Sequence, residues 1–331
     1  MPDYTSANSI SGLFLVWKKY QRRPEVLAPL INCKLKFIPH LFRSKYLRSL
    51  DYLIKLVVSI KDIVVKKPDF VVAQCPPTFS ALPAWLTKTP YIIDAHNPLF
   101  QVEMWQKLPL TQSLLQNAVG IIVHNLEMER LVSKLIPNLQ LFTISDPIVP
   151  IVPTQPQTRQ PKQILVIASF DPWDEPVELL IAAMKELNEY QFIVTADVNK
   201  LDSQTAVSLQ ALDNVNLTGF LAIEEYHQML CSSLAALVLT TSNATQPSGA
   251  CEALSSDTQL VISKTSLTET LFGDWATVVD NSAEAIATAI RGLSLQDLDL
   301  TKYRQQWNTN VQQEVDRMLE QVTKSQDNNI N

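Results

Sequence analysis

The sequence predicts an α/β protein with two doubly wound parallel sheets, each forming a Rossmann-like domain. Short apolar runs alternate with amphipathic stretches along most of the chain. The alternation is interrupted once, between Pro147 and Pro161, by a segment that contains five prolines and has no periodicity. Strands that alternate with helices imply a parallel sheet covered on both faces, and 331 residues suffice for about two domains.

The first domain is expected over residues 1–150. Its apolar runs predict strands at Ser11–Trp17, Lys34–Ile38, Asp69–Ala73, Tyr91–Asp94, Gly120–His124 and Leu141–Ile144. Its amphipathic stretches predict helices at Pro24–Asn32, Tyr46–Lys66, Thr78–Leu86, Thr111–Asn117 and Glu127–Leu135. In Tyr46–Lys66 the apolar residues recur at helical spacing, and Lys and Arg occupy the other face.

A proline-rich linker is expected over 151–161 and a second domain over 162–300. Its predicted strands are Ile164–Ala168, Gln191–Thr195, Val215–Thr218, Ala235–Thr240, Gln259–Ile262 and Thr277–Val279. Its predicted helices are Pro176–Asn188, Ile223–Ser232, Gly249–Ser255, Leu267–Phe272 and Ala283–Leu293. A closing helix over 301–322 and a loose polar tail over 323–331 complete the chain.

Scarce glycine, cysteine and histidine exclude several kinds of site. The six glycines are too far apart for a dinucleotide fingerprint, a P-loop or a nucleophile elbow. A phosphate site must therefore depend on helix N-termini and side chains. The four cysteines form no C-x-x-C pair and are expected to be buried thiols in a reducing compartment. The four histidines lack metal-site spacing, so we expect no metal and no cofactor.

The charge of the chain is unevenly distributed. Residues 1–70 contain 13 Lys and Arg against five Asp and Glu, a charge of +8, whereas the rest carries −14. The basic part suggests an anionic surface or ligand near the first domain, or a solvated basic face. The acidic pI argues against nucleic acid. No secretory signal or membrane-spanning run is evident, which predicts a cytoplasmic protein.

Polar residues that follow predicted strands are the candidate site residues, because ligands of open parallel sheets bind beyond the carboxyl ends of the strands. Two such domains predict a site in the gap between them. Asp94, His96 and Asn97 follow the strand that begins at Tyr91. Histidine titrates near neutrality and can act as a general base that Asp94 orients. Alternatively, His96 caps a helix or satisfies a turn.

The loop after Leu239 is rich in hydroxyl and amide groups and leads into a helix of small residues. Its members Gln246, Ser248, Gly249 and Ala250 have the form of an anion site at a helix N-terminus. Glu252 is expected in the first turn of that helix, where it could accept hydrogen bonds from ribose hydroxyls. The alternative is a polar loop with a capping glutamate.

Two further loops contain candidates. Ser169 and Phe170 follow the first strand of the second domain, and Ser169 could bind a phosphate. The acidic residues after them, Asp171, Asp174 and Glu175, disfavour phosphate at their own positions, and we expect Asp174 and Glu175 to cap the next helix. In the first domain, Arg22 and Arg23 could contact an anionic acceptor or the donor diphosphate. Alternatively, they lie in an exposed basic loop.

The sequence resembles the two-domain, GT-B fold retaining glycosyltransferases known as group 1 or family 4. The strongest match is Gln246–Leu254 followed by Gln259–Ser263, similar to the family's small-residue helix with its glutamate and the next strand. Supporting matches are Gln74–Pro77, Tyr91–Asn97, Asp146–Pro147 and Ala168–Phe170. In order and spacing these segments extend over about residues 11–293.

The resemblance implies a nucleotide-sugar donor in the C-terminal domain and an acceptor mainly in the N-terminal one. Glu252 would bind the donor ribose, while Ser248, Gly249, Ala250 and Ser169 would lie near the diphosphate. His96 would lie near the transferred sugar. A bound metal is not expected, because helix dipoles and basic side chains stabilise the leaving diphosphate in such folds.

The chain departs from the family pattern at two places. Ala244 stands eight residues before Glu252, where the family often has a second glutamate. Ser169–Asp171 and Asp197 stand where Arg and Lys usually follow the first C-terminal strands.

The expected function is transfer of a sugar to a glycan or lipid-linked acceptor, in polysaccharide or glycolipid biosynthesis. The basic N-terminal part would suit peripheral contact with an anionic membrane. The alternatives are a nucleotide-sugar epimerase of the same architecture and a non-catalytic partner protein.

Overall fold

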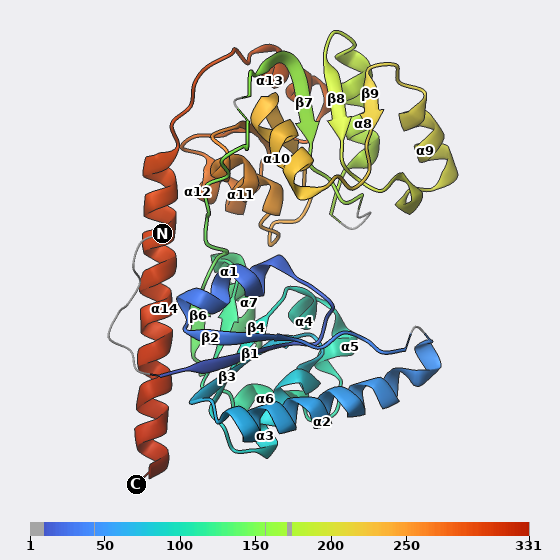
Figure 1. The fold of residues 1–331 in the computed structure, drawn as a ribbon. Coiled ribbons are helices and arrows are strands. Elements are labelled where there is room, and N and C mark those ends of the chain that lie inside the picture. The colour runs from blue at the N-terminus through green and yellow to red at the C-terminus, as the bar shows by residue number, and fades with distance from the viewer. Residues whose placement is uncertain (1–9, 43, 156, 171–173, 331) are drawn as a thin grey trace. The chain divides into compact units, whose positions relative to one another are not determined.

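The computed structural model describes residues 10–42, 44–155, 157–170 and 174–330, and it divides the chain into two units (Figure 1). Unit 1 comprises residues 1–147 and 308–331, and unit 2 comprises residues 148–307. Each unit is built around its own six-stranded sheet, and every strand pairing in the two sheets is parallel. The predicted fold class, two doubly wound α/β domains, is confirmed.

The sheet of unit 1 has the strand order β2-β1-β3-β4-β5-β6. Its strands are β1 (Gly12–Val16), β2 (Cys33–Phe37), β3 (Phe70–Cys75), β4 (Tyr91–Ala95), β5 (Gly120–Val123) and β6 (Leu141–Thr143). The chain runs outward in both directions from β1 and β3, so the switch point of this sheet lies between these two strands. A ligand crevice is expected beyond their carboxyl ends.

The helices of unit 1 lie close to the predicted ranges. They are α1 (Arg22–Leu30), α2 (Arg48–Lys66), α3 (Leu82–Leu86), α6 (Thr111–Gln116) and α7 (Leu126–Leu135), with 3₁₀ turns η1 (Lys45–Leu47) and η2 (Thr78–Ala81). Two short helices, α4 (Pro98–Gln101) and α5 (Glu103–Gln106), have no counterpart in the sequence prediction.

The sheet of unit 2 has the order β12-β11-β10-β7-β8-β9, with its switch point between β7 and β10. Its strands are β7 (Gln160–Val166), β8 (Gln191–Val194), β9 (Val215–Leu217), β10 (Ser233–Val238), β11 (Gln259–Ser263) and β12 (Thr277–Val279). Its helices are α8 (Val177–Glu186), α9 (Ser203–Gln210), α10 (Ile223–Ser232), α11 (Ser248–Ser255), α12 (Ser266–Phe272) and α13 (Ala283–Arg291), and a 3₁₀ turn, η3 (Val198–Lys200), follows β8. The sequence prediction lacks α9.

Alternate residues of the central strand β7 enter different cores on the two faces of this sheet. Ile164 and Val166 pack in one cluster with residues of α8 and α13. Leu165 packs in the other with residues of α11 and α12. Successive side chains of a strand point to opposite faces of the sheet, which produces this separation. The polar loops follow the carboxyl ends of β7 and β10.

The closing helix corrects the prediction for the C-terminus. Helix α14 runs over Thr301–Ile330, so the segment 323–330 is helical rather than a loose tail. Its first residues belong to unit 2, where Arg304 donates to the Leu254 carbonyl at 3.0 Å. From residue 308 onward it belongs to unit 1, where Gln326 donates to the Asp69 carbonyl at 2.7 Å. Contacts with unit 1 therefore stabilise a polar segment that has little apolar periodicity of its own.

Helix α2 reverses the usual arrangement of an amphipathic helix. A surface helix normally turns its apolar face to the core, but the fully buried positions of α2 include Asp51, Lys55 and Ser59. Its outward positions are largely apolar. In the described parts of the chain, every helix is too short or too polar to span a bilayer.

Candidate functional site

A buried carboxylate organises the carboxyl edge of the sheet in unit 1. Asp94 lies near the end of β4 and is fully buried. Its Oδ1 accepts a hydrogen bond from Arg23 Nε at 3.1 Å. Arg23 lies in the first turn of α1, and its guanidinium also donates to Asp146 and, at 2.8 Å, to the Ile144 carbonyl. One side chain therefore ties together the segments after β1, β4 and β6.

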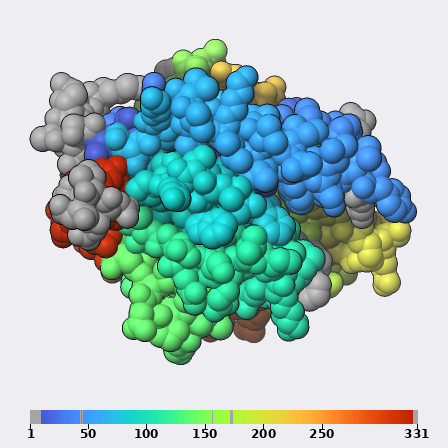
Figure 2. Space-filling model, turned by 90° about the horizontal axis from the view of Figure 1, so that it is seen from below, coloured from blue at the N-terminus to red at the C-terminus, as the bar shows by residue number. Residues whose placement is uncertain are grey.

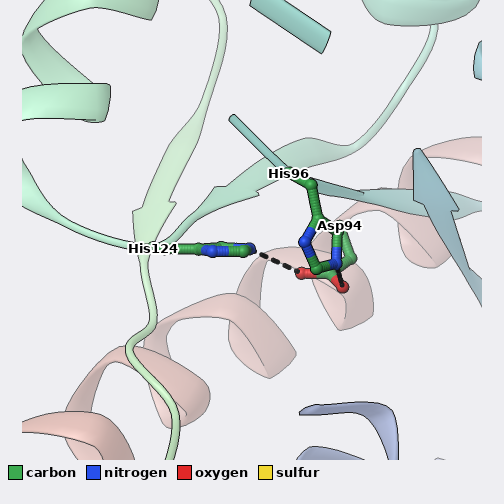
Figure 3. Close-up of side chains that lie close together, drawn as sticks. All are labelled: Asp94, His96 and His124. Carbon is green, nitrogen blue, oxygen red and sulfur yellow. Dashed lines mark ion pairs between the residues drawn. The ribbon is translucent and has the colours of Figure 1, made fainter. Parts of the chain in front are cut away.

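Two imidazoles approach the same carboxylate from different sides (Figure 3). His96 Nε2 lies 3.6 Å from Asp94 Oδ2, and His124 Nε2 lies 3.8 Å from Asp94 Oδ1. The two rings pack edge to face with their centroids 4.6 Å apart. Gln21 Nε2 lies 3.2 Å from His96 Nε2, so the loop after β1 also contacts this imidazole.

Arg23 determines the charge state of the cluster. Burial alone would raise the pKa of Asp94, but the Arg23 guanidinium and the two imidazoles outweigh burial and hold that pKa well below its ordinary value. Burial lowers the pKa of His124, and the positive charge of Arg23 lowers it further. Asp94 is therefore ionised and His124 neutral near pH 7.

The spacing of this cluster would suit a metal ion, but its charge argues for another role. Asp94, His96 and His124 each offer one ligand atom, and these atoms lie within 4.8 Å of one another. The Arg23 guanidinium already compensates the Asp94 carboxylate at hydrogen-bond distance. A divalent cation would have to bind beside that buried positive charge, which Coulomb repulsion opposes.

The structure brings some of the predicted residues of unit 1 together and corrects others. Asp94 and His96 are in contact, and Asn97 begins the turn into α4, where its carbonyl accepts from Gln101 N–H at 3.0 Å. Arg22 is exposed at the start of α1. Arg23 was expected to contact an acceptor, but it is only 3% exposed and its donors already bind two carboxylates and a carbonyl.

His124 was not among the predicted site residues. It directly follows β5, next to β4 in the sheet, so its place at a strand end could have identified it.

In unit 2, the loop after β7 presents backbone amides to an anion. The N–H groups of Ser169 and Phe170 donate to the carboxylate of Glu175 at 2.8 Å each, and the Ser169 hydroxyl donates to it at 2.8 Å. Phe170 has a φ of 54°, a left-handed conformation that accompanies this convergence of amides. The Glu175 carboxylate thus accepts hydrogen bonds from three donors of this loop.

The neighbouring acid, Asp174, binds the loop after β10. Its carbonyl accepts from Thr241 N–H at 2.6 Å, and its carboxylate accepts from Thr240 Oγ1 and, at 3.3 Å, from Ser242 N–H. Capping of the next helix was therefore the wrong prediction for Asp174 and Glu175: α8 begins at Val177, and Glu178 is the acid of its first turn. Asp171, the other acid of this loop, lies outside the described residues.

Lys200 supplies a cation that the sequence analysis missed. It ends η3, the turn that follows β8, and its Nζ donates to the Ser169 carbonyl at 3.0 Å. It lies three residues after Asp197, one of the positions where the sequence departs from the family pattern. The cation therefore reaches the loop after β7 from the neighbouring strand of the sheet.

Helix α11 carries the predicted glutamate. The helix begins at Ser248, so Glu252 lies in its second turn rather than its first, and the Tyr226 hydroxyl of α10 donates to Glu252 Oε2. Gln246 Nε2 lies 3.4 Å from the Cys251 sulfur. Ser248 is exposed, whereas Ala250 is buried and its N–H donates to the Pro247 carbonyl at 3.2 Å.

Gly249 allows α11 to approach the sheet closely. A Cβ at this position would lie 2.9 Å from a methyl carbon of Ile167 and 3.0 Å from one of Val238. Ile167 precedes Ser169 by two residues, so this contact places the start of α11 beside the loop that holds Glu175. The structure thus gives Gly249 a packing role.

Residues 161–296 match the family model described as "Glycosyl transferases group 1". This segment holds nearly all of the sheet of unit 2 and its helices α8 to α13. The resemblance seen in the sequence is thereby confirmed in the unit that contains Glu252 and the Ser169 loop. No curated protein sequence matches the chain.

Solved structures share the fold of both units, not only of the segment that matches the family model. HepE of Anabaena, in complex with UDP and glucose, is 14% identical with a TM-score of 0.66, and the alignment covers 97% of this chain and 99% of that one. Sucrose-phosphate synthase of Thermosynechococcus elongatus is 15% identical, with a TM-score of 0.57 and coverages of 96% and 87%. A UDP-N-acetylglucosamine 2-epimerase is 14% identical, with a TM-score of 0.55 and coverages of 92% and 91%. The predicted GT-B fold class is confirmed.

Replacing Arg23 tests its structural role. Arg23→Gln removes the cation from a buried ion pair and leaves the Asp94 carboxylate uncompensated, so the free energy of unfolding should fall by about 3–5 kcal/mol. Urea denaturation followed by circular dichroism measures the change. Arg22→Gln is the matched control, because this neighbouring exposed arginine should change stability by no more than about 0.5 kcal/mol. Equal effects of the two substitutions would contradict the assignment.

His124 should make stability depend on pH. Its pKa is lower in the folded state than the ordinary 6.5, so protons bind preferentially to the unfolded chain below that pH. The free energy of unfolding is therefore unaffected by His124 well above pH 6.5. Below that pH it decreases, by up to about 1.4 kcal/mol per pH unit. Urea denaturation at pH 7.5 and at lower pH should show a smaller loss for His124→Gln than for wild type. Parallel pH profiles would refute this role of His124.

Proposed function

We propose that the protein is a glycosyltransferase that moves a sugar from a nucleotide-sugar donor to a glycan or lipid-linked acceptor. The observation that carries this proposal is the convergence of the Ser169 and Phe170 amides and the Ser169 hydroxyl on one carboxylate, at the switch point of a group 1 domain. Such a group of donors suits the oxygens of a phosphate.

The donor diphosphate would replace the Glu175 carboxylate at these amides. Ser169 Oγ can donate to a phosphate oxygen as it now donates to Glu175, and the Lys200 ammonium lies against the same loop. Ser248 and Gly249 begin α11, where the helix dipole favours an anion, and Gln246 and Ala250 flank this start. Glu252, held by the Tyr226 hydroxyl, would accept hydrogen bonds from the ribose.

Unit 1 would provide the acceptor side and the proton chemistry. Asp94 is kept ionised by Arg23 and orients the His96 imidazole, whose ring nitrogen would accept the proton of the acceptor hydroxyl. Asn97 would lie beside His96 as a further polar contact. Arg22, exposed at the start of α1, is the remaining basic candidate for an anionic acceptor. The amides that hold the diphosphate would stabilise the charge that develops on the leaving group.

The finer features of the proposal follow from the family resemblance and the charge distribution. They are hexosyl transfer with retention of configuration, a role in polysaccharide or glycolipid biosynthesis, and a cytoplasmic location with peripheral contact to the inner face of an anionic membrane. The charge of +8 over residues 1–70 supports the membrane contact.

A nucleotide-sugar epimerase is the second candidate. The structural similarity to a UDP-N-acetylglucosamine 2-epimerase over 92% of this chain favours it. An epimerase converts the nucleotide sugar without an acceptor, whereas a transferase releases nucleoside diphosphate in proportion to the glycosylated acceptor. Chromatography of the products from a panel of sugar nucleotides, with and without acceptor lipid, separates the two. A non-catalytic protein would give neither product.

Two substitutions separate donor binding from turnover. Glu252→Gln removes a charged acceptor of ribose hydrogen bonds and should weaken UDP or GDP binding by about tenfold or more in calorimetry. His96→Asn should leave that affinity unchanged and lower kcat by about a hundredfold or more. Glu224→Gln, an exposed acid on α10, is the control for Glu252. Wild-type binding by Glu252→Gln would remove the donor site, and wild-type kcat in His96→Asn would remove the catalytic assignment.

Removing Glu175 tests whether its carboxylate competes with the donor. Glu175→Ala should tighten nucleoside diphosphate binding by about tenfold, because the ligand no longer displaces a carboxylate that accepts three hydrogen bonds. The unliganded protein should also be less stable, by about 1–2 kcal/mol. Glu178→Ala, on the next exposed acid, is the matched control and should change neither quantity. Unchanged or weaker binding by Glu175→Ala would show that the phosphate lies elsewhere.

A further inference from the structure

Helix α2 binds its own unit through polar side chains. Asp51 accepts from the Leu41 N–H at 3.0 Å, and Lys55 Nζ donates to the Trp17 carbonyl at 2.9 Å. Ser59 Oγ accepts from the Trp17 indole N–H at 3.1 Å. These three residues are fully buried, and burial lowers the pKa of Lys55 to about 8. The polar stripe of the helix thus binds the segments that follow β1 and β2.

The opposite face of α2 is apolar and exposed. We define the α2 apolar face as Leu50, Leu53, Val57 and Val64, which recur at helical spacing. Leu53 is 55% exposed, Val57 59% and Val64 57%. Figure 2 shows the blue segment that contains α2 lying in the open on the side seen there. An exposed apolar row along a helix of 19 residues, about 28 Å long, is typical of an interaction surface.

The apolar character continues beyond α2 itself. Tyr46 and Leu47, directly before the helix, are exposed. Helix α3, which packs against α2, exposes Trp85 and Leu86. Aromatic rings with one polar edge favour the boundary between water and an apolar phase.

The charges in and beside this face are positive. Lys61 is exposed within the row, between Val57 and Val64, and Lys66 and Lys67 are exposed at the end of the helix. The two acids within Arg48–Lys66 are turned away from solvent, since Asp51 is buried and Asp62 is mostly buried. Asp62 Oδ2 also lies 3.4 Å from Lys36 Nζ and 3.2 Å from Lys66 Nζ. An apolar face with lysines beside it and no exposed carboxylate on the helix is complementary to anionic lipid headgroups over acyl chains.

We propose that the α2 apolar face docks unit 1 on an anionic lipid surface, with the helix lying in the plane of the interface. The inference identifies the surface for the membrane contact proposed above and does not depend on the donor site. Buried polar contacts hold the helix against the protein, so the apolar side chains are already in place to enter the headgroup region without refolding.

Co-sedimentation of the full-length chain with vesicles tests the proposal. Wild type should bind phosphatidylcholine vesicles that contain phosphatidylglycerol, bind pure phosphatidylcholine at least about tenfold more weakly, and dissociate at high salt. The double substitution Leu53→Glu with Val57→Glu should lower binding to anionic vesicles by at least about tenfold. Val207→Glu, at a valine on α9 that is 64% exposed, is the matched control and should bind like wild type.

Two further measurements make the outcome decisive. Thermal unfolding and UDP or GDP calorimetry of the double variant should match wild type, so that failure of this inference and failure of the donor site are distinguishable. Wild-type vesicle binding by the double variant, or equal binding of wild type to neutral and anionic vesicles, would overturn the proposal. So would a wild-type dimer in light scattering that the double variant abolishes while neither protein binds vesicles, because the face would then join two copies of the chain.

Discussion

Parallel pairing of every strand is the constraint on which both candidate sites depend. In a parallel sheet all carboxyl ends lie on one edge, so a polar residue after any strand is brought to the same side as its counterparts. In unit 1 this gathers Arg23, Asp94, His96 and His124 from segments far apart in sequence. In unit 2 it gathers the loops that follow β7, β8 and β10. The chemistry of each unit follows from which residues occupy those ends.

The two units use their buried and semi-buried acids differently. Asp94 is fully buried and bound by the Arg23 guanidinium, so its carboxylate cannot move away without losing the cation that compensates it. Glu175 is only partly buried and is held by two amides and a hydroxyl, donors that a phosphate could equally satisfy. The first arrangement is a permanent part of the fold, and the second is one that a stronger anion can displace. This difference is why we assign the donor diphosphate to the Ser169 loop.

Periodicity predicted the strands and most helices because apolar alternation directly reflects burial in this fold. The placement of Asp94 and His96 at the end of a strand, and of Glu252 on the next helix after a strand, followed from the same pattern. Other features depend on tertiary contacts that no local pattern contains. Arg23 is buried because Asp146, distant in sequence, lies beside it. Lys200 reaches the Ser169 loop from a neighbouring strand. The apolar residues of α2 recur with a helical period, but only the contacts of the helix show which face is turned inward. The polar segment that contains Gln326 has no such period, and its contact to the Asp69 carbonyl is visible only in the structure.

The central claim is that a diphosphate binds where the loops after β7 and β10 meet. Hydrogen exchange of the backbone amides tests this claim most directly. The account predicts that UDP or GDP slows exchange in the peptides that contain Ser169 and Phe170 and in those that span Thr240–Glu252, while peptides at the opposite edge of the same sheet are unaffected. Protection confined to other peptides, or none at saturating nucleotide, would contradict it.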